Sequence, residues 1–328
     1  MTILAMWTEP PGWDENSFSG WTREDNTDYR NPDRSRASWR RMSSERATKT
    51  FAPQTEVWVH TFAARGGASI SQVSGDYFAV RDADDNVFFS IRGTGSNTTK
   101  VSVGAFFMSD VVDLFEGVGS AALDFFLKID STNGEFKAFV DGTEVFSFTG
   151  DTRGLFLGTA EKLTVDKNSS ATNRANHIYF TEMIIATTPT IGKVLWTREV
   201  TQGATHEWSG NISNVNGLEF PEQGNELTTD QANSLTRFAI QAIPQLNEGQ
   251  VFAAVSLETS AAADNASGIG SIDYEIYDSA GGHGAVNIET TAGFKPHFAI
   301  WEADPRDNSD WDGVKLAEIE LGMTSKDT

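Results

Sequence analysis

The chain has 328 residues, 39% of them hydrophobic, no cysteine and a formal net charge of -21. This length is enough for two ordinary cores, and the lack of cysteine excludes disulfides, cysteine-bound zinc, iron–sulfur clusters and thiol nucleophiles. The strong negative charge argues against nucleic-acid binding, which depends on clustered Lys and Arg.

The start of the chain shows no targeting signal. Met1 to Pro11 has neither a basic start nor a long apolar run, so no signal peptide is predicted. Polar or charged residues interrupt every apolar stretch before it reaches the roughly 20 residues of a membrane span. The sequence therefore predicts a protein that is made in the cytoplasm and does not insert into a membrane.

Residues 9–46 are polar and rich in turn-forming residues, and we expect long loops around short strands. Trp13, Trp21 and Tyr29 lie in this segment. Because aromatic faces pack on the apolar faces of sugar rings, these three residues are candidates for a ligand-binding surface. The alternative is a structural role, in which the aromatic residues tie the segment to a core.

From Phe51 onward, short β-branched and aromatic runs alternate with clusters of Gly, Asn and Asp, which is typical of antiparallel strands joined by tight turns. The clearest unit is a three-strand meander from Leu123 to Phe148, with turns at Asn133-Gly134 and Asp141-Gly142. The other strands expected in this half are 56–62, 77–81, 87–92, 98–103 and 178–185.

Ala186 to Thr190 is expected to link two domains, at 1–188 and 189–328. Residues 189–328 hold 21 acidic and 7 basic residues, a net charge of -14. The predicted fold class is all-β, with two antiparallel β-sandwich (jelly-roll) domains. The second domain is expected to contain strands at 193–200, 237–243, 251–257, 271–277, 285–288 and 294–301, a last stretch at 314–321, and helical turns within 227–234 and 314–321.

Two carboxylates are candidates for glycosidase chemistry, which uses an acid and a second carboxylate. Asp273 and Glu275 alternate with apolar residues, so both should project from one strand face. The alternative is a solvated strand face in an acidic domain. Because the ordered Glu-x-Asp-x-x-Glu run of sandwich-fold glucanases is absent, no catalytic residue is assigned and no enzymatic activity is predicted.

A weak metal-site candidate lies in the loop 82–86. Asp82, Asp84 and Asn86 offer the oxygen ligands that Ca²⁺ prefers, but the loop lacks the glycine and the distant glutamate of an EF-hand. Turn formation alone also explains these residues, because Asp and Asn cap their own turns. Apart from this possible calcium ion, no cofactor is predicted.

Three tryptophans fall within expected strands. Trp58, Trp196 and Trp301 are interpreted as core residues, because they lie inside runs of strand-forming residues. This interpretation leaves the aromatic residues of the segment 9–46 as the candidates for ligand contact.

The meander carries a resemblance to a known fold family. Leu127-Lys-Ile-Asp130, Gly134 and Phe139-Val-Asp-Gly-Thr-Glu-Val145 resemble the strand–turn–strand of concanavalin A-like and laminin-G-like jelly rolls. Val57 to Phe62 and Ile178 to Ala186 fit the early and final strands of that fold. The resemblance implies a lectin-like first domain, covering about Trp13 to Ala186, and carries over no calcium-binding or sugar-binding residues.

The second half resembles β-rich domains of tailed-phage and gene-transfer-agent minor virion proteins. Phe298-Ala-Ile-Trp-Glu-Ala-Asp-Pro305, Trp311 and Leu316-Ala-Glu-Ile-Glu-Leu-Gly322 carry it, with Pro189-Thr-Ile-Gly192. The resemblance implies a virion location, as a head spike, head fibre or tail fibre component. It further implies contacts with other virion proteins and host adsorption through surface polysaccharide.

Three functions remain open from the sequence. The first is a carbohydrate-binding virion surface protein, present as a homo-oligomer or in multiple copies. The second is a purely architectural head or tail component without sugar binding, docked through the arginine-containing segment Arg23 to Arg46. The third is a polysaccharide depolymerase that uses Asp273 and Glu275.

Overall fold

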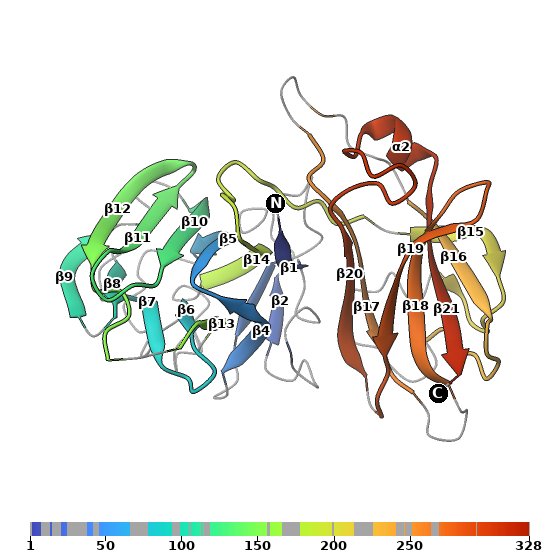
Figure 1. Ribbon diagram of the computed structural model, residues 1–328, viewed down its shortest axis with the longest axis horizontal. Helices are drawn as coiled ribbons and strands as arrows, with labels where there is room; N and C mark the ends of the chain where they lie inside the picture. Colours follow the sequence, from blue (N-terminus) through green and yellow to red (C-terminus); the bar gives the residue numbers. More distant parts are fainter. Residues whose placement is uncertain are drawn as a thin grey trace. The chain divides into compact units, whose positions relative to one another are not determined.

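The computed structural model describes the chain as strands and turns, with α2 (Gly313–Ala317) as a short helix, and confirms the predicted all-β class (Figure 1). It divides into two compact units, Met1–Thr197 and Arg198–Thr328. Among the residues described, no helix has both the length and the apolar composition needed to cross a bilayer. The described residues are 2–7, 14, 21–24, 38–41, 46–65, 78–93, 99–104, 106–112, 114, 119–155, 158–165, 178–198, 200–212, 226–240, 246, 251–263, 269–292 and 294–327.

The first unit contains a large antiparallel sheet. Its described strands follow the order β12-β11-β10-β5-β14-β3-β2, and β1 also pairs with β14. Strands from both ends of the first unit therefore share one sheet, as the jelly-roll prediction requires. The bounds are β1 (Ile3–Trp7), β2 (Trp21–Glu24), β3 (Ser38–Arg41), β5 (Glu56–Arg65), β10 (Ser120–Lys128), β11 (Gly134–Val140), β12 (Thr143–Gly150) and β14 (Ile178–Ala186).

A second antiparallel sheet of the first unit has the described order β4-β13-β6-β7-β8-β9. Buried phenylalanine rings from the two sheets contact each other: Phe89 of the second sheet lies 5.6 Å from Phe125 and 4.6 Å from Phe136 of the large sheet. The two sheets therefore enclose one core, as in a β-sandwich. The bounds are β4 (Ala47–Gln54), β6 (Phe78–Arg81), β7 (Val87–Gly93), β8 (Thr99–Val103), β9 (Phe106–Val112) and β13 (Ala160–Val165).

The predicted meander is confirmed as β10, β11 and β12. Asp141 and Gly142 form the turn between the last two strands with φ of 46° and 80°, the left-handed conformation that a two-residue hairpin turn requires and that Asp and Gly tolerate. The Asp141 side chain also accepts a 2.9 Å hydrogen bond from the Ala122 backbone N–H. The turn is thereby fixed to the neighbouring strand.

The prediction of a strand at 193–200 is wrong, because residues 193–198 form no strand and β15 begins only at Val200. The backbone N–H of Lys193 donates to the carbonyl of Thr190, and that of Leu195 donates to the side chain of Glu182. Because these donors are already used, the segment does not join a ladder. Residues 193–197 belong instead to the first unit, which ends at Thr197.

The second unit has two antiparallel layers. Its described strands form a five-stranded sheet, β15-β16-β21-β18-β19, and a ladder of β17 with β20. Buried residues of both layers, among them Tyr274, Leu321 and Trp301, belong to one hydrophobic core. The bounds are β15 (Val200–His206), β16 (Leu235–Ile240), β17 (Val255–Ala261), β18 (Ile269–Tyr277), β19 (Gly282–Glu289), β20 (Lys295–Trp301) and β21 (Glu320–Asp327).

Of the two predicted helical turns, one is present in the structure and the other is absent. Helix α2 overlaps the predicted range 314–321, and the Asp312 side chain caps it by accepting from the Lys315 backbone N–H at 2.8 Å. The turn expected at 227–234 is wrong, since that segment forms no helix. Thr228 instead exchanges two backbone hydrogen bonds with Ser209 in an isolated β-bridge, and a non-helical turn follows at 231–233.

Candidate functional site

Three aromatic side chains lie together on the large sheet, on the face opposite the core. Trp58 of β5 pairs directly with Phe126 of β10, with ring centroids 4.9 Å apart, and its ring stacks on Phe139 of β11 at 5.8 Å. Val57 and Val59 are fully buried, so strand alternation turns Trp58 outward. We call Trp58, Phe126 and Phe139 the aromatic stack.

The aromatic stack is partly accessible. Trp58 and Phe126 are half-buried, whereas Phe139 is buried. The interpretation of Trp58 as a core residue is therefore wrong, and Trp196 is also half-buried. Trp301 is buried in the second unit, as expected. The alternation of Trp58 with Val57 and Val59 was visible in the sequence, but it did not show which of the two sides faces the core.

Charged groups border the aromatic stack. Lys137 lies directly opposite Phe126, and its ammonium is 2.5 Å from a Glu135 carboxylate oxygen. This hydrogen bond raises the pKa of Lys137 above its usual value. At the strand ends, Lys128 lies 3.8 Å from Glu56. The stack thus offers an apolar surface with hydrogen-bonding groups at its margin, the combination found at small-molecule and sugar sites.

A buried polar network adjoins the stack. Asp124 of β10 pairs with Phe139 on one side and His60 on the other. Its Oδ1 accepts hydrogen bonds from Thr190 Oγ1 at 2.7 Å and from Nδ1 of His60 at 2.9 Å. Asp124, His60 and Thr190 are each at most 1% exposed. Because Thr190 donates to the aspartate and not to the histidine, the three do not form a nucleophilic triad.

Residues 187–197, which we call the strap, cross the outer face of the large sheet. The strap leaves β14 after Ala186, which pairs with Trp58, and reaches Asp124 through Thr190. It then returns to β14, where the Leu195 N–H donates to Glu182 Oε2 at 3.2 Å. Glu182 is fully buried, at a bulge with φ of 55°. Two buried carboxylates thus fix the strap beside the aromatic stack.

The calcium candidates lie in the turn between β6 and β7. Asp82 is buried, and its Oδ1 accepts hydrogen bonds from the backbone N–H groups of Asp84 and Asn86 at 3.0 and 2.8 Å. Its Oδ2 accepts from Asn86 Nδ2 at 2.7 Å. The described part of the chain holds no group of three or more His, Asp or Glu arranged for a metal. The hydrogen bonds give Asp82 a structural role in the turn, and no described contact tests the calcium site suggested by the sequence.

The aromatic candidates of the N-terminal segment are not brought to this site by any described contact. Trp13 and Tyr29 lie outside the described residues. Trp21 begins β2 and pairs with Arg41 of β3, while its side chain is outside the described set. A ligand surface at these three residues stays a prediction.

Asp273 and Glu275 project from one face of β18, because Ile272, Tyr274 and Ile276 are buried on the other. Asp273 accepts from Asn287 Nδ2 at 2.6 Å and lies 3.4 Å from the Lys326 ammonium. Glu275 accepts from the Tyr277 hydroxyl at 2.5 Å. Both carboxylates are therefore engaged by neighbouring side chains, as expected for a polar sheet face.

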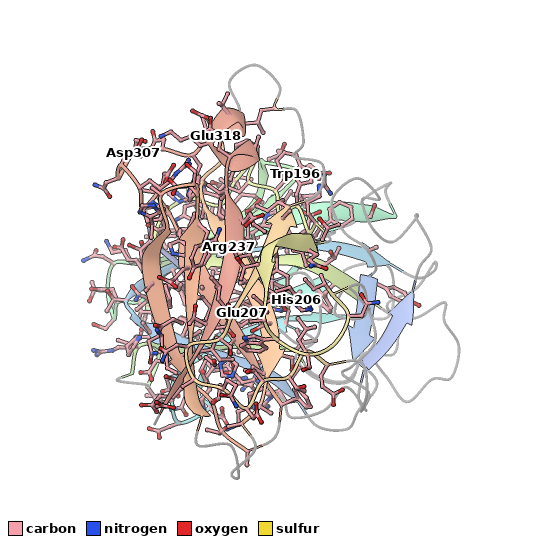
Figure 2. The ribbon with its side chains drawn as sticks, turned by 90° about the vertical axis from the view of Figure 1, so that its right-hand side faces the viewer. Trp196, His206, Glu207, Arg237, Asp307 and Glu318 are labelled. Carbon is pink, nitrogen blue, oxygen red and sulfur yellow. The ribbon has the colours of Figure 1, made fainter. Side chains whose placement is uncertain are left out.

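Arg237 and Tyr277 lie at the centre of this polar face. The Arg237 guanidinium is 4.3 Å from the ring centroid of Tyr277 and 3.7 Å from a Glu320 oxygen. Burial and the hydrogen bond with Glu275 raise the pKa of Tyr277. Figure 2 looks onto the second unit, with Arg237 on the sheet and Glu318 and Asp307 at the end that carries α2. The described charged side chains named on this face thus contact one another through ion pairs and hydrogen bonds.

No protein-family model matches the sequence, and no curated protein matches it. Among solved structures, the chain is similar to an endo-β-1,4-glucuronan lyase from the fungus Trichoderma reesei, with 12% identity over 57% of this chain and 96% of that chain and a TM-score of 0.39. It is also similar to the binding domain of botulinum neurotoxin serotype D, with 7% identity over 57% and 47% of the two chains and a TM-score of 0.38. A structure describing ganglioside-dependent cell entry of botulinum neurotoxin type C matches over 100% of this chain and 94% of that chain, with 11% identity and a TM-score of 0.37. These TM-scores are too low to assign function.

Proposed function

We propose that the protein binds carbohydrate through the aromatic stack of Trp58, Phe126 and Phe139. The observation that carries the proposal is the half-buried Trp58–Phe126 pair on the outer face of the large sheet. An aromatic surface of this kind packs against the apolar face of a sugar ring, and bordering charged groups accept and donate hydrogen bonds to hydroxyls.

We further propose that the protein acts on a phage-type virion, as a head spike, head fibre or tail fibre component that aids host adsorption. The resemblance of Phe298–Pro305, Trp311 and Leu316–Gly322 to minor virion proteins supports this role. Other virion proteins and host surface polysaccharide would be its partners, and the virion its location.

The second candidate function is an architectural role, which the negative charge of the second unit supports. The second unit, residues 198–328, contains 21 acidic and 6 basic residues, a net charge of -15. Arg237, Arg306, Lys315 and Lys326 each lie in an ion pair with a carboxylate of the same unit. The excess negative charge would suit a basic neighbour in an assembled particle.

Cleavage of the carbohydrate is the weakest candidate. Asp273 contacts Lys326 and Asn287, and Glu275 contacts Tyr277. These contacts would have to break before either carboxylate could act on a glycosidic bond. We therefore propose binding without hydrolysis. Release of reducing ends from polysaccharide by the wild-type protein, abolished in Glu275→Gln, would support the depolymerase instead.

The test is retention of purified protein on immobilised capsule or envelope polysaccharide from candidate hosts. Trp58→Ala should bind roughly tenfold or more weakly, since a tryptophan at the centre of a contact typically contributes a large share of affinity. Trp58→Phe should keep part of the binding. Phe62→Ala, a half-buried aromatic on the same face of β5, is the matched control and should bind as wild type.

Unchanged retention of a folded Trp58→Ala variant would exclude the aromatic stack as the site. If the wild-type protein is retained on no polysaccharide, the architectural role becomes the better proposal. Circular dichroism of each variant separates loss of binding from loss of folding.

A further inference from the structure

We propose that β12 is a self-association edge, through which two copies of the chain pair antiparallel about a two-fold axis. β12 ends the large sheet as far as the structure describes its strands, and it pairs with β11 on one side (Figure 1, green). Five of its eight residues are exposed, and Phe146 and Phe148 are half-buried. An accessible strand edge offers alternate backbone N–H and C=O groups to another strand.

The composition of β12 favours pairing. Its sequence, Thr-Glu-Val-Phe-Ser-Phe-Thr-Gly, is rich in β-branched and aromatic residues, and Glu144 is its single charged residue. Natural edge strands are usually protected by lysine, proline or a bulge. Three other described edges have such protection: β4 contains Pro53, β20 contains Pro296, and β15 is irregular between Gln202 and His206. β12 contains neither lysine nor proline, and its own irregularity lies near its start, so Phe146 to Gly150 keep a regular pairing with β11.

Apolar side chains at this edge remain incompletely covered. Val145, at the irregularity where β11 and β12 shift register, is 39% exposed. Phe146 and Phe148 pair with Ala138 and Phe136 on the core side, and the Phe146 ring lies 6.0 Å from Phe136. A strand added at β12 would cover these side chains at the rim of the sandwich.

We assign a second copy as the occupant, because antiparallel pairing of β12 with itself about Ser147 brings aromatic residues opposite each other on both sides of the axis. Antiparallel pairing with Ser147 on the axis sets Phe146 opposite the partner's Phe148 and Val145 opposite the partner's Thr149. The two Glu144 side chains then lie at opposite ends of the interface, separated by about 20 Å along the strands. No like charges face each other across the pair.

A dimer paired through β12 would also carry two aromatic stacks, and their use as carbohydrate sites rests on the proposed function. A two-fold axis perpendicular to the sheet keeps both outer faces on the same side. The strand order β12-β11-β10-β5 separates the two Trp58 positions by seven strand spacings, roughly 34 Å. Two stacks on one continuous sheet would engage one repeating polysaccharide and increase its apparent affinity through avidity.

Sedimentation velocity over a concentration series tests the dimer. The wild-type protein should form a concentration-dependent dimer. Ser147→Lys should be monomeric, because it places two ammonium groups next to each other at the axis. Ser131→Lys is the matched control, with the same change at an exposed turn residue of the same meander, and should remain dimeric. A wild-type monomer at every concentration, or a folded Ser147→Lys dimer, would overturn the proposal.

Carbohydrate binding gives a second, separable readout. Ser147→Lys should bind long polysaccharide at least about tenfold more weakly and a short oligosaccharide as well as wild type. Equal polysaccharide affinity of monomer and dimer would exclude bivalent binding while leaving the dimer. A wild-type dimer that binds no carbohydrate would refute the proposed function but support the β12 interface.

Discussion

The hydroxyl of Thr190 donates a 2.7 Å hydrogen bond to the buried carboxylate of Asp124, 66 residues earlier in the chain. This bond joins the strap to the outer face of the large sheet, next to the aromatic stack. The same carboxylate oxygen accepts from His60, so one buried aspartate orders both a strand neighbour and a distant segment. Buried carboxylates are retained only where such donors compensate for lost hydration.

Thr190→Val should loosen the strap, because it removes one donor to a buried carboxylate without changing the side-chain size. The expected cost is about 1–3 kcal/mol in the free energy of local opening. Hydrogen exchange of the Lys193 and Leu195 backbone N–H groups measures it. Thr190→Ser, which keeps the hydroxyl, should protect these groups almost as well as wild type. Equal protection in Thr190→Val would show that the strap is held by other contacts.

Gly322→Ala should destabilise the second unit. A Cβ at Gly322 would overlap the Tyr277 ring, which crosses β21 at this point. Relief of the overlap requires a shift of the Tyr277 ring, which also contacts Arg237, at an expected cost of about 1–3 kcal/mol in unfolding free energy. Gly313→Ala is the matched control, since no heavy atom lies within 4 Å of its added Cβ. Chemical denaturation should separate the two variants.

The loop after β20 should contribute stability that is lost in acid. Hydrogen bonds from Ser309 and Lys315 lower the pKa of Asp307 from 3.8 to about 2. A carboxyl group whose pKa is depressed by folding stabilises the native state above its unfolded pKa, and this contribution disappears as pH falls through the folded pKa. Asp307→Asn should therefore lower the Tm at neutral pH, and the difference from wild type should shrink as the pH falls below 3.8 and vanish below pH 2. Asp310→Asn, at an exposed carboxylate of the same loop, is the control.

Asp82 should matter for folding and not through calcium. Asp82→Ala leaves two backbone N–H groups and the Asn86 amide without their acceptor, which should cost about 1–3 kcal/mol in unfolding free energy. Calcium should leave the Tm of the wild-type protein unchanged. A calcium-dependent rise in Tm that is absent from Asp84→Asn would instead support the metal site predicted from the sequence.

Much of the fold was accessible from local sequence. The meander follows from alternation and from turn residues that tolerate positive φ, as Asp141 and Gly142 do. The outward direction of Asp273 and Glu275 follows from the period of two along β18. These features depend on neighbouring residues alone, and strand geometry converts them directly into structure.

Contacts between residues far apart in the chain determined the features that local sequence did not predict. Residues 193–197 have strand-like composition, yet the N–H groups of Lys193 and Leu195 donate to Thr190 and Glu182 and attach the segment to the first unit. Alternation sets Trp58 opposite to Val57 and Val59, but only the phenylalanine core between the two sheets determines which side faces outward. The pairing of Thr190 with Asp124 likewise has no local signal. Sequence determined the strands and turns because these are local, whereas the site depended on which distant side chains the packed sheets bring together.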